Sequence, residues 1–203
     1  MNKAIKKCRL KRQVVIGFEV YQRKESVVLL SSAVIHTRHL TMVTINESGM
    51  TFGPFLDDQV YQIEKAEAYT HLGEGVKVVE FIYKQKTEKF FFVEAKNSSP
   101  MPKGEEFKKF IREISDKFVH SFDLWLSLNL KRRKDDVASK NVLDAKINKQ
   151  IFRFILVIKG HEKSWLPPIS EALRREMMAE IKIWKHEIIV INDQQAKQRG
   201  LIM

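Results

Sequence analysis

Residues 89–96 read KFFFVEAK, an apolar and aromatic run that ends in a glutamate and a lysine two positions apart. Aromatic and β-branched residues in such a run are typical of a β-strand. The stretch VKVVEFIY at 76–83 has the same character, and a short polar loop joins the two. We therefore predict a β-hairpin over residues 76–96.

The faces of this hairpin bring charged side chains together. Alternation places Glu80 on one face of the first strand, and Glu94 and Lys96 on one face of the second. If Tyr83 pairs with Phe91, Glu80 lies opposite Glu94, whereas a register shifted by one residue would place them on opposite faces. Two carboxylates on an apolar face repel each other unless a positive charge lies between them. A divalent cation is the natural candidate for that charge.

The chain after the hairpin predicts a covered sheet. Apolar residues at helical spacing predict an amphipathic helix over 105–128. Nearly continuous apolar runs at 151–160 and 186–193 predict two strands, joined by a helix over 164–181. A strand, helix and strand in this order predict parallel pairing with a right-handed crossover. The expected fold class is therefore α/β, with a mixed β-sheet in which an antiparallel hairpin lies beside a parallel strand pair, flanked by helices.

The chain before the hairpin predicts a helix and a β-rich extension. Residues 57–72, DDQVYQIEKAEAYTHL, begin with an aspartate cap candidate and predict a helix whose apolar side includes Glu64. Upstream, short β-rich runs at 14–21, 26–36, 41–45 and 50–55 predict antiparallel strands. We therefore expect a basic tail with a β-rich extension over residues 1–56 and a core domain over 57–203.

The charge of the chain favours nucleic acid as a partner. The formal net charge is +11, which attracts polyanions because Lys and Arg release the counterions condensed on phosphates. Two basic clusters are the candidate contacts: Lys6, Lys7, Arg9, Lys11 and Arg12 in the tail, and Lys131, Arg132, Arg133 and Lys134 in a polar connection. We expect DNA in preference to RNA. Solvated basic faces are the alternative interpretation of both clusters.

No apolar run reaches the roughly 20 residues that a membrane span needs, and the N-terminus has no secretory h-region. Cytoplasmic residence without a membrane partner is therefore the expectation.

The element order and the Glu94-Ala95-Lys96 triplet resemble the PD-(D/E)xK phosphodiesterase superfamily, which has the restriction-endonuclease-like fold. The resemblance implies that Glu94 and Glu80 bind Mg²⁺ or Mn²⁺ and that Lys96 is the catalytic lysine that positions or activates the attacking water. It also implies that Glu64 is the additional acid that many members carry on the preceding helix.

The chain departs from that pattern at one place. The superfamily usually has Asp, within a loose Pro-Asp motif, where this chain has Glu80, so Glu74 competes as the second metal ligand. The expected function is a metal-dependent nuclease, by analogy a subunit of a larger, defence-type system with a protein partner that supplies specificity. The alternative is an inactive nuclease-like protein that binds nucleic acid or serves as a scaffold.

Three other features have weaker interpretations. The same acid-x-lysine spacing occurs at Asp144–Lys146 and Glu180–Lys182, where the expected connection and helix end predict solvated charges. Trp165 is assigned to the core, with a substrate or partner surface as the alternative.

Overall fold

The computed structural model describes residues 12–15, 18–23 and 26–30 through their strands, and residues 41–85 and 88–203 in full. The chain divides into two compact units, Met1–His39 and Leu40–Met203. The sequence analysis grouped residues 41–56 with the N-terminal extension, whereas this division places them in the same unit as the central sheet.

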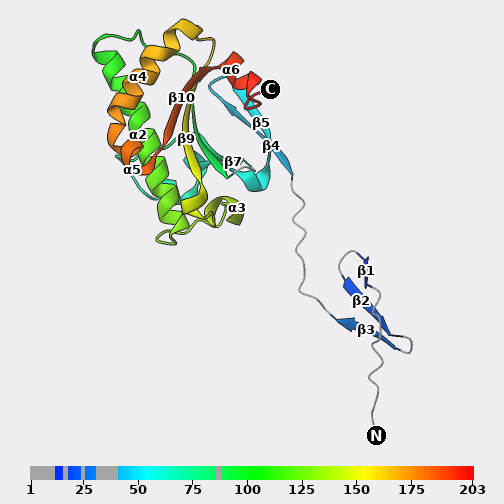
Figure 1. The fold of residues 1–203 in the computed structure, drawn as a ribbon. Helices are drawn as coiled ribbons and strands as arrows, with labels where there is room; N and C mark the ends of the chain where they lie inside the picture. The colour runs from blue at the N-terminus through cyan, green and yellow to red at the C-terminus, as the bar shows by residue number, and fades with distance from the viewer. Residues whose placement is uncertain (1–11, 16–17, 24–25, 31–40, 86–87) are drawn as a thin grey trace. The chain divides into compact units, whose positions relative to one another are not determined.

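The first unit contains a three-stranded antiparallel sheet with the order β1-β2-β3 (Figure 1). Its strands are β1 (Arg12–Val15), β2 (Phe18–Arg23) and β3 (Ser26–Leu30). The stretch 14–21, predicted as one strand, contributes to two strands of a hairpin in which Val15 pairs with Phe18. The basic residues Lys6, Lys7, Arg9 and Lys11 lie outside the described residues, and Arg12 is described only as part of β1.

The second unit is built on a five-stranded sheet with the order β10-β9-β8-β7-β6. These strands are β6 (Val60–Tyr61), β7 (Phe81–Gln85), β8 (Lys89–Lys96), β9 (Ile151–Ile158) and β10 (Glu187–Asn192). β7 and β8 form the antiparallel hairpin, while β8, β9 and β10 run parallel. The predicted α/β class with a mixed sheet is confirmed.

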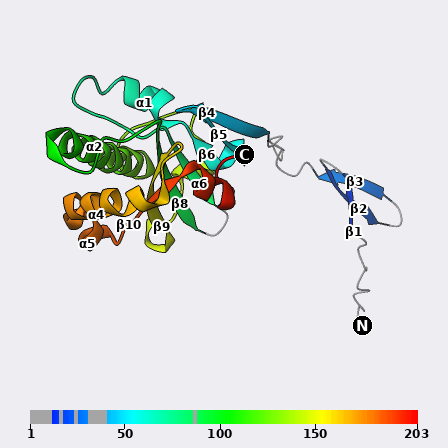
Figure 2. The same ribbon diagram turned by 90° about the horizontal axis from the view of Figure 1, so that it is seen from above.

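Helices cover one face of this sheet, and a hairpin with a short helix covers part of the other (Figures 1 and 2). The first face carries α2 (Gly104–Asn129), α4 (Leu166–Glu176) and α5 (Met178–Trp184). The second face carries β4 (Met42–Glu47), β5 (Met50–Leu56) and α6 (Asp193–Gln198). The predicted helix over 105–128 is confirmed, and the one predicted over 164–181 is divided at Met177. Within the described ranges, no helix is both long and apolar enough to cross a bilayer.

The prediction of one helix over residues 57–72 is wrong. The segment contains the 3₁₀ turns η1 (Asp57–Gln59) and η2 (Ile63–Lys65), the edge strand β6 between them, and the single turn α1 (Glu67–Thr70). Val60 and Tyr61 pair with Tyr83 and Ile82 of β7 instead of forming helical turns. Sheet pairing therefore overrides the local helical pattern, as tertiary context often does.

The first hairpin strand is shorter than predicted, because β7 begins only at Phe81. In the stretch before it, the Lys77 amide donates to His120 Nδ1 at 3.1 Å and the Val79 amide to Ser121 Oγ at 2.8 Å. Both acceptors are side chains of α2, which therefore replace strand pairing for these amides. Residues 76–80 are thus fixed against the helix, and Glu80 stands where this segment joins the sheet.

Candidate functional site

Glu94 is the buried centre of the candidate site. It lies near the end of β8 on the face that carries α2, and its side chain has no solvent exposure. Its Oε1 lies 2.8 Å from Lys117 Nζ and 3.3 Å from Lys96 Nζ. Its Oε2 is buried and has no hydrogen-bond partner among the described residues. Burial raises the pKa of Glu94, although the two lysines oppose this shift.

Of the two registers that the sequence left open, the hairpin has the one that sets Glu80 opposite Glu94. Tyr83 pairs with Phe91 and Phe81 pairs with Val93, so the next position along the ladder sets Glu80 opposite Glu94. The two carboxylates therefore converge on one side of the sheet, as the alternation of side chains requires.

Lys117, which the sequence analysis did not single out, supplies a positive charge between these carboxylates. Its Nζ lies 2.8 Å from Glu94 Oε1 and 3.8 Å from Glu80 Oε1, and only 14% of its side chain is exposed. It comes from α2, where it borders the apolar stripe. The signal in the sequence was the polar series Glu113, Lys117 and Ser121 at intervals of four residues, which places them on one side of a helix.

Lys96 is held as a cation by two carboxylates. Its Nζ donates to Glu113 Oε1 at 2.9 Å, and Glu94 Oε1 lies at 3.3 Å. Burial alone would lower the pKa of Lys96, but the hydrogen bond to Glu113 and the charges of Glu94 and Glu113 outweigh burial and raise it. The same hydrogen bond lowers the pKa of Glu113. The pair is therefore charged at neutral pH.

Glu80 stands in an acidic environment. Burial, a hydrogen bond with Glu64 and the charge of Glu94 together raise the pKa of its carboxyl from 4.5 to about 8, while Lys117 opposes this shift. One ligand oxygen from each of Glu47, Glu64 and Glu80 lies within 4.8 Å of the other two. Glu64 is therefore close to Glu80 as expected, but it projects from η2 and not from a helix.

Glu47, at the end of β4, is the second residue that the sequence analysis missed. The turn that follows it is attached to the site strand, because Ser48 Oγ donates to the carbonyl of Ala95 at 2.9 Å. Lys65 Nζ lies 3.6 Å from Glu47 Oε1. No local pattern in residues 41–56 marks Glu47, because only tertiary contact brings β4 to the end of β8.

Three of the carboxyl groups, those of Glu47, Glu64 and Glu80, lie close enough together to hold one divalent cation. Five carboxyl groups and three ammonium groups gather here: Glu47, Glu64, Glu80, Glu94 and Glu113 with Lys65, Lys96 and Lys117. Mg²⁺ and Mn²⁺ bind carboxylate oxygens, and the group that could share one ion is Glu47, Glu64 and Glu80, whereas Glu94 is not part of this group. Lys117 is the group with which such an ion would compete for the carboxylates.

The other predicted residues lie apart from this cluster. Glu74 is exposed in the turn between Gly73 and Gly75. The basic cluster Lys131, Arg132, Arg133 and Lys134 is exposed beyond the end of α2, and it starts 14 residues after Lys117, or about 20 Å along a helix. In the second acid-x-lysine triplet, Asp144 pairs with Lys131.

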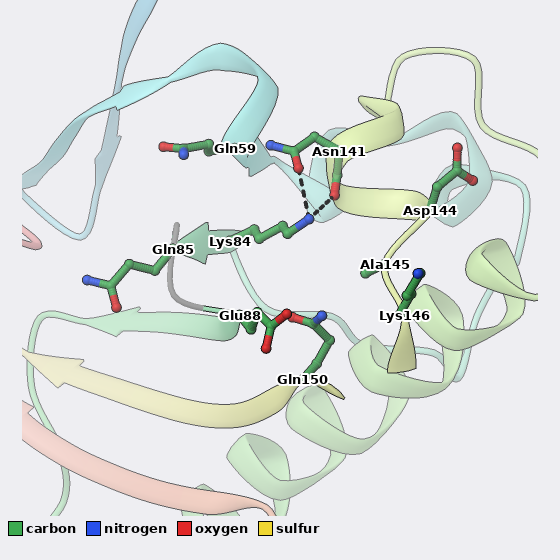
Figure 3. A pocket seen from close by; sticks show the side chains of 9 residues that line it. All are labelled: Gln59, Lys84, Gln85, Glu88, Asn141, Asp144, Ala145, Lys146 and Gln150. Atoms are coloured by element: carbon green, nitrogen blue, oxygen red, sulfur yellow. Dashed lines mark hydrogen bonds between the residues drawn. The ribbon is translucent and has the colours of Figure 1, made fainter. Parts of the chain in front are cut away.

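A polar pocket of about 380 Å³ lies at the opposite end of β8 (Figure 3). It is lined by Gln59, Lys84, Gln85, Glu88, Asn141, Asp144, Ala145, Lys146 and Gln150. Lys84 Nζ points across it and donates to the carbonyl and to Oδ1 of Asn141, so its hydrogen bonds are already made within the protein. Ligands of α/β sheets bind beyond the carboxyl ends of the strands, where Lys96 lies and this pocket does not.

Searches with the chain found no matching family model, curated protein or solved structure. Any function proposed for the chain therefore rests on the residues of the site and their geometry.

Proposed function

We propose that the chain is a metal-dependent nuclease that hydrolyses phosphodiester bonds of nucleic acid, with a restriction-endonuclease-like fold of the PD-(D/E)xK superfamily. The observation that carries the proposal is Glu94, buried at the carboxyl end of a strand with Lys96 two residues further on and Glu80 opposite. The order of hairpin, long helix, strand, helix and strand supports it.

Glu80 and Glu94 would hold Mg²⁺ or Mn²⁺, with Glu64 and Glu47 next to Glu80. When bound, the ion would stabilise the charge that develops on the phosphate and lower the pKa of a bound water. Lys96 is charged at neutral pH, so its role in this proposal is to donate a hydrogen bond to the attacking water or to a phosphate oxygen. It is not the base that removes the proton.

A second candidate function is supported by Lys117. Its ammonium group lies 2.8 Å from Glu94 Oε1 and 3.8 Å from Glu80 Oε1, so both carboxyl groups already have a cation beside them. A nuclease-like protein that binds nucleic acid without cleaving it would keep such an arrangement with no metal. Cleavage and metal binding distinguish the two functions.

The test is cleavage of labelled single- and double-stranded DNA and RNA in Mg²⁺, in Mn²⁺ and in EDTA. We expect cutting that requires the metal and that falls roughly a hundredfold or more in Glu94→Gln and Lys96→Met. Binding of Mn²⁺, followed by electron paramagnetic resonance, should weaken in Glu80→Gln and Glu94→Gln.

Glu180→Gln and Lys182→Met are the matched controls, because they alter the same spacing of acid and lysine at a helix end. Both should cut like the native protein. Metal-independent binding without cleavage in any metal would reject the nuclease and leave the second function.

A further inference from the structure

Trp165 is an exposed indole beside the carboxyl ends of the parallel strands. The sequence analysis assigned it to the core, yet 46% of the residue is exposed. It ends the 3₁₀ turn η4 (Lys163–Trp165), immediately before α4. Exposure alone does not mark a site, since single exposed hydrophobic residues are common, but the place of this indole in the fold does.

The Trp165 ring is held in position although it is exposed, because it packs against His161. Its ring lies 5.5 Å from that of His161, at an interplanar angle of 87°. His161 Nε2 is 3.1 Å from Ser99 Oγ, and the His161 carbonyl accepts from Asn192 Nδ2 at 2.7 Å. The segments that follow β8, β9 and the end of β10 therefore meet at His161.

His161 and its partners lie at the same sheet edge as the candidate site. Lys96 and Ile158 are register partners, and the Lys159 amide donates to the Lys96 carbonyl at 2.9 Å. Ser99 and His161 each follow these partners by three residues, a span of at most about 11 Å. A short oligonucleotide could reach from Lys96 to the indole.

Two lysines and one glutamate, Glu162, lie next to His161 and Trp165 in the chain, so the local net charge is positive and suits a phosphate backbone. Lys159 and Lys163 are both exposed on either side of His161 in the chain. Lysines provide backbone attraction without reading sequence, whereas an aromatic ring provides a face on which a base can stack. A base within a duplex is already stacked and paired, so only an unpaired base can use this face without first being flipped out.

We propose that Trp165 is a base-stacking platform and that the polymer bound at this edge is single-stranded nucleic acid. The inference rests on the proposed function for the role of the neighbouring site, but it concerns binding and not cleavage. It names the substrate class: a single strand, DNA or RNA, whose unpaired base lies on Trp165 while its phosphate backbone passes Lys159 towards Lys96.

The test is fluorescence anisotropy of labelled 12-nucleotide DNA, RNA of the same sequence, and the corresponding 12-base-pair DNA duplex. The full chain is used in EDTA, so that no metal-dependent cleavage occurs. Trp165→Ala should weaken single-strand binding roughly ten- to hundredfold and duplex binding much less. Trp165→Phe should restore most of the affinity, because it keeps an aromatic face. The ratio of the DNA and RNA affinities shows which strand the platform prefers.

Trp184→Ala is the matched control, since Trp184 is similarly exposed, at 42%, but lies at the end of α5. It should leave single-strand affinity unchanged, and thermal unfolding shows that each variant is folded. Unchanged single-strand affinity in folded Trp165→Ala, or equal losses for single strand and duplex, would overturn the inference.

The two proposals fail separately. Single-strand binding that depends on Trp165, without cleavage in Mg²⁺ or Mn²⁺, would reject the nuclease and keep the platform. Metal-dependent cleavage, together with the same single-strand affinity in the native protein and in Trp165→Ala, would reject the platform and keep the nuclease.

Discussion

At Glu94, one carboxylate oxygen lies close to two ammonium groups while the other has no partner within the described chain. Removal of one member of a buried ion pair costs about 3–5 kcal/mol, because the remaining charge stays buried. Lys96 remains beside Glu94 when Lys117 is removed, so the expected cost is at the lower end of that range.

Lys117→Met should therefore lower the free energy of unfolding by about 3 kcal/mol at neutral pH. If the carboxylates form a metal site, millimolar Mn²⁺ should restore part of this loss, because an ion that binds only the folded state stabilises it. Urea unfolding with and without Mn²⁺ measures both effects. Lys182→Met is the control, and a Lys117→Met protein as stable as the native one would contradict the structural role given to this lysine.

His186 is a second buried ionisable residue. It packs among the rings of Phe122, Phe154 and Trp184, and both of its ring nitrogens lack partners within the described chain. Burial lowers its pKa from 6.5 to about 4. Between these values the unfolded state binds a proton that the folded state excludes, so the native protein loses stability as the pH falls through this window.

His186→Phe should remove that loss and also the unpartnered nitrogens. We expect the variant to be more stable than the native protein, with an advantage that grows by up to about 1.4 kcal/mol per pH unit from pH 6.5 towards pH 4. Urea unfolding at pH 7 and pH 5 measures the difference. His71→Phe, at an exposed position, is the control. An advantage independent of pH would show that His186 does not titrate with this lowered pKa.

At the scale of elements, two backbone amides of segment 76–80 donate to side chains of a helix instead of to a neighbouring strand. The Val79 amide donates to Ser121 Oγ, and Ser121 is fully buried in α2. Because Glu80 follows Val79 directly, this hydrogen bond also positions the carboxylate that faces Glu94.

Ser121→Ala leaves the buried Val79 amide without this acceptor. We expect a loss of about 1–3 kcal/mol in unfolding free energy and faster hydrogen exchange at Val79. Ser127→Ala is the control in the same helix, because Ser127 Oγ donates to the carbonyl of Leu124 within α2 itself. Unchanged exchange at Val79 would mean that the Ser121 hydroxyl does not secure this segment.

The elements with strong periodicity could be predicted from the sequence, and those fixed by distant contacts could not. The hairpin and the helix over 105–128 follow from local patterns. The register, and with it the meeting of Glu80 with Glu94, was one of two alternatives that only the structure decides. Residues 57–72 carry a helical pattern, but pairing with β7 breaks it. Glu47 and Lys117 were missed because their place in the site depends on how β4 and α2 pack against β8.

At the scale of the whole molecule, the division after His39 separates much of the net positive charge from the unit that holds the candidate site, because residues 1–39 contain nine Lys and Arg but only two acidic residues. The sheet and both apolar clusters are formed within Leu40–Met203. This unit should therefore fold without the first.

A protein that begins at Leu40 should keep the thermal unfolding midpoint of the second unit. Its nucleic-acid affinity should fall and depend less on salt, because each phosphate that the basic tail no longer neutralises removes about 0.7–0.9 from the slope of log K against log salt. Binding titrations between roughly 50 and 200 mM salt, where this effect is large, measure the slope. A strongly lowered midpoint would contradict the independence of the second unit, and an unchanged slope would exclude the first unit from binding.

The parallel pairing of β8 with β9 has a consequence for folding during synthesis. β8 carries the run Phe90-Phe91-Phe92-Val93, and the strand that completes its pairing ends 62 residues after Lys96, at Ile158. At about 5–20 residues per second, the ribosome leaves one edge of this apolar strand unpaired for roughly 3–12 s. The unpaired edge of an apolar run such as 90–93 is a template for aggregation. The nascent chain should therefore be most dependent on chaperones in that interval, before β9 emerges.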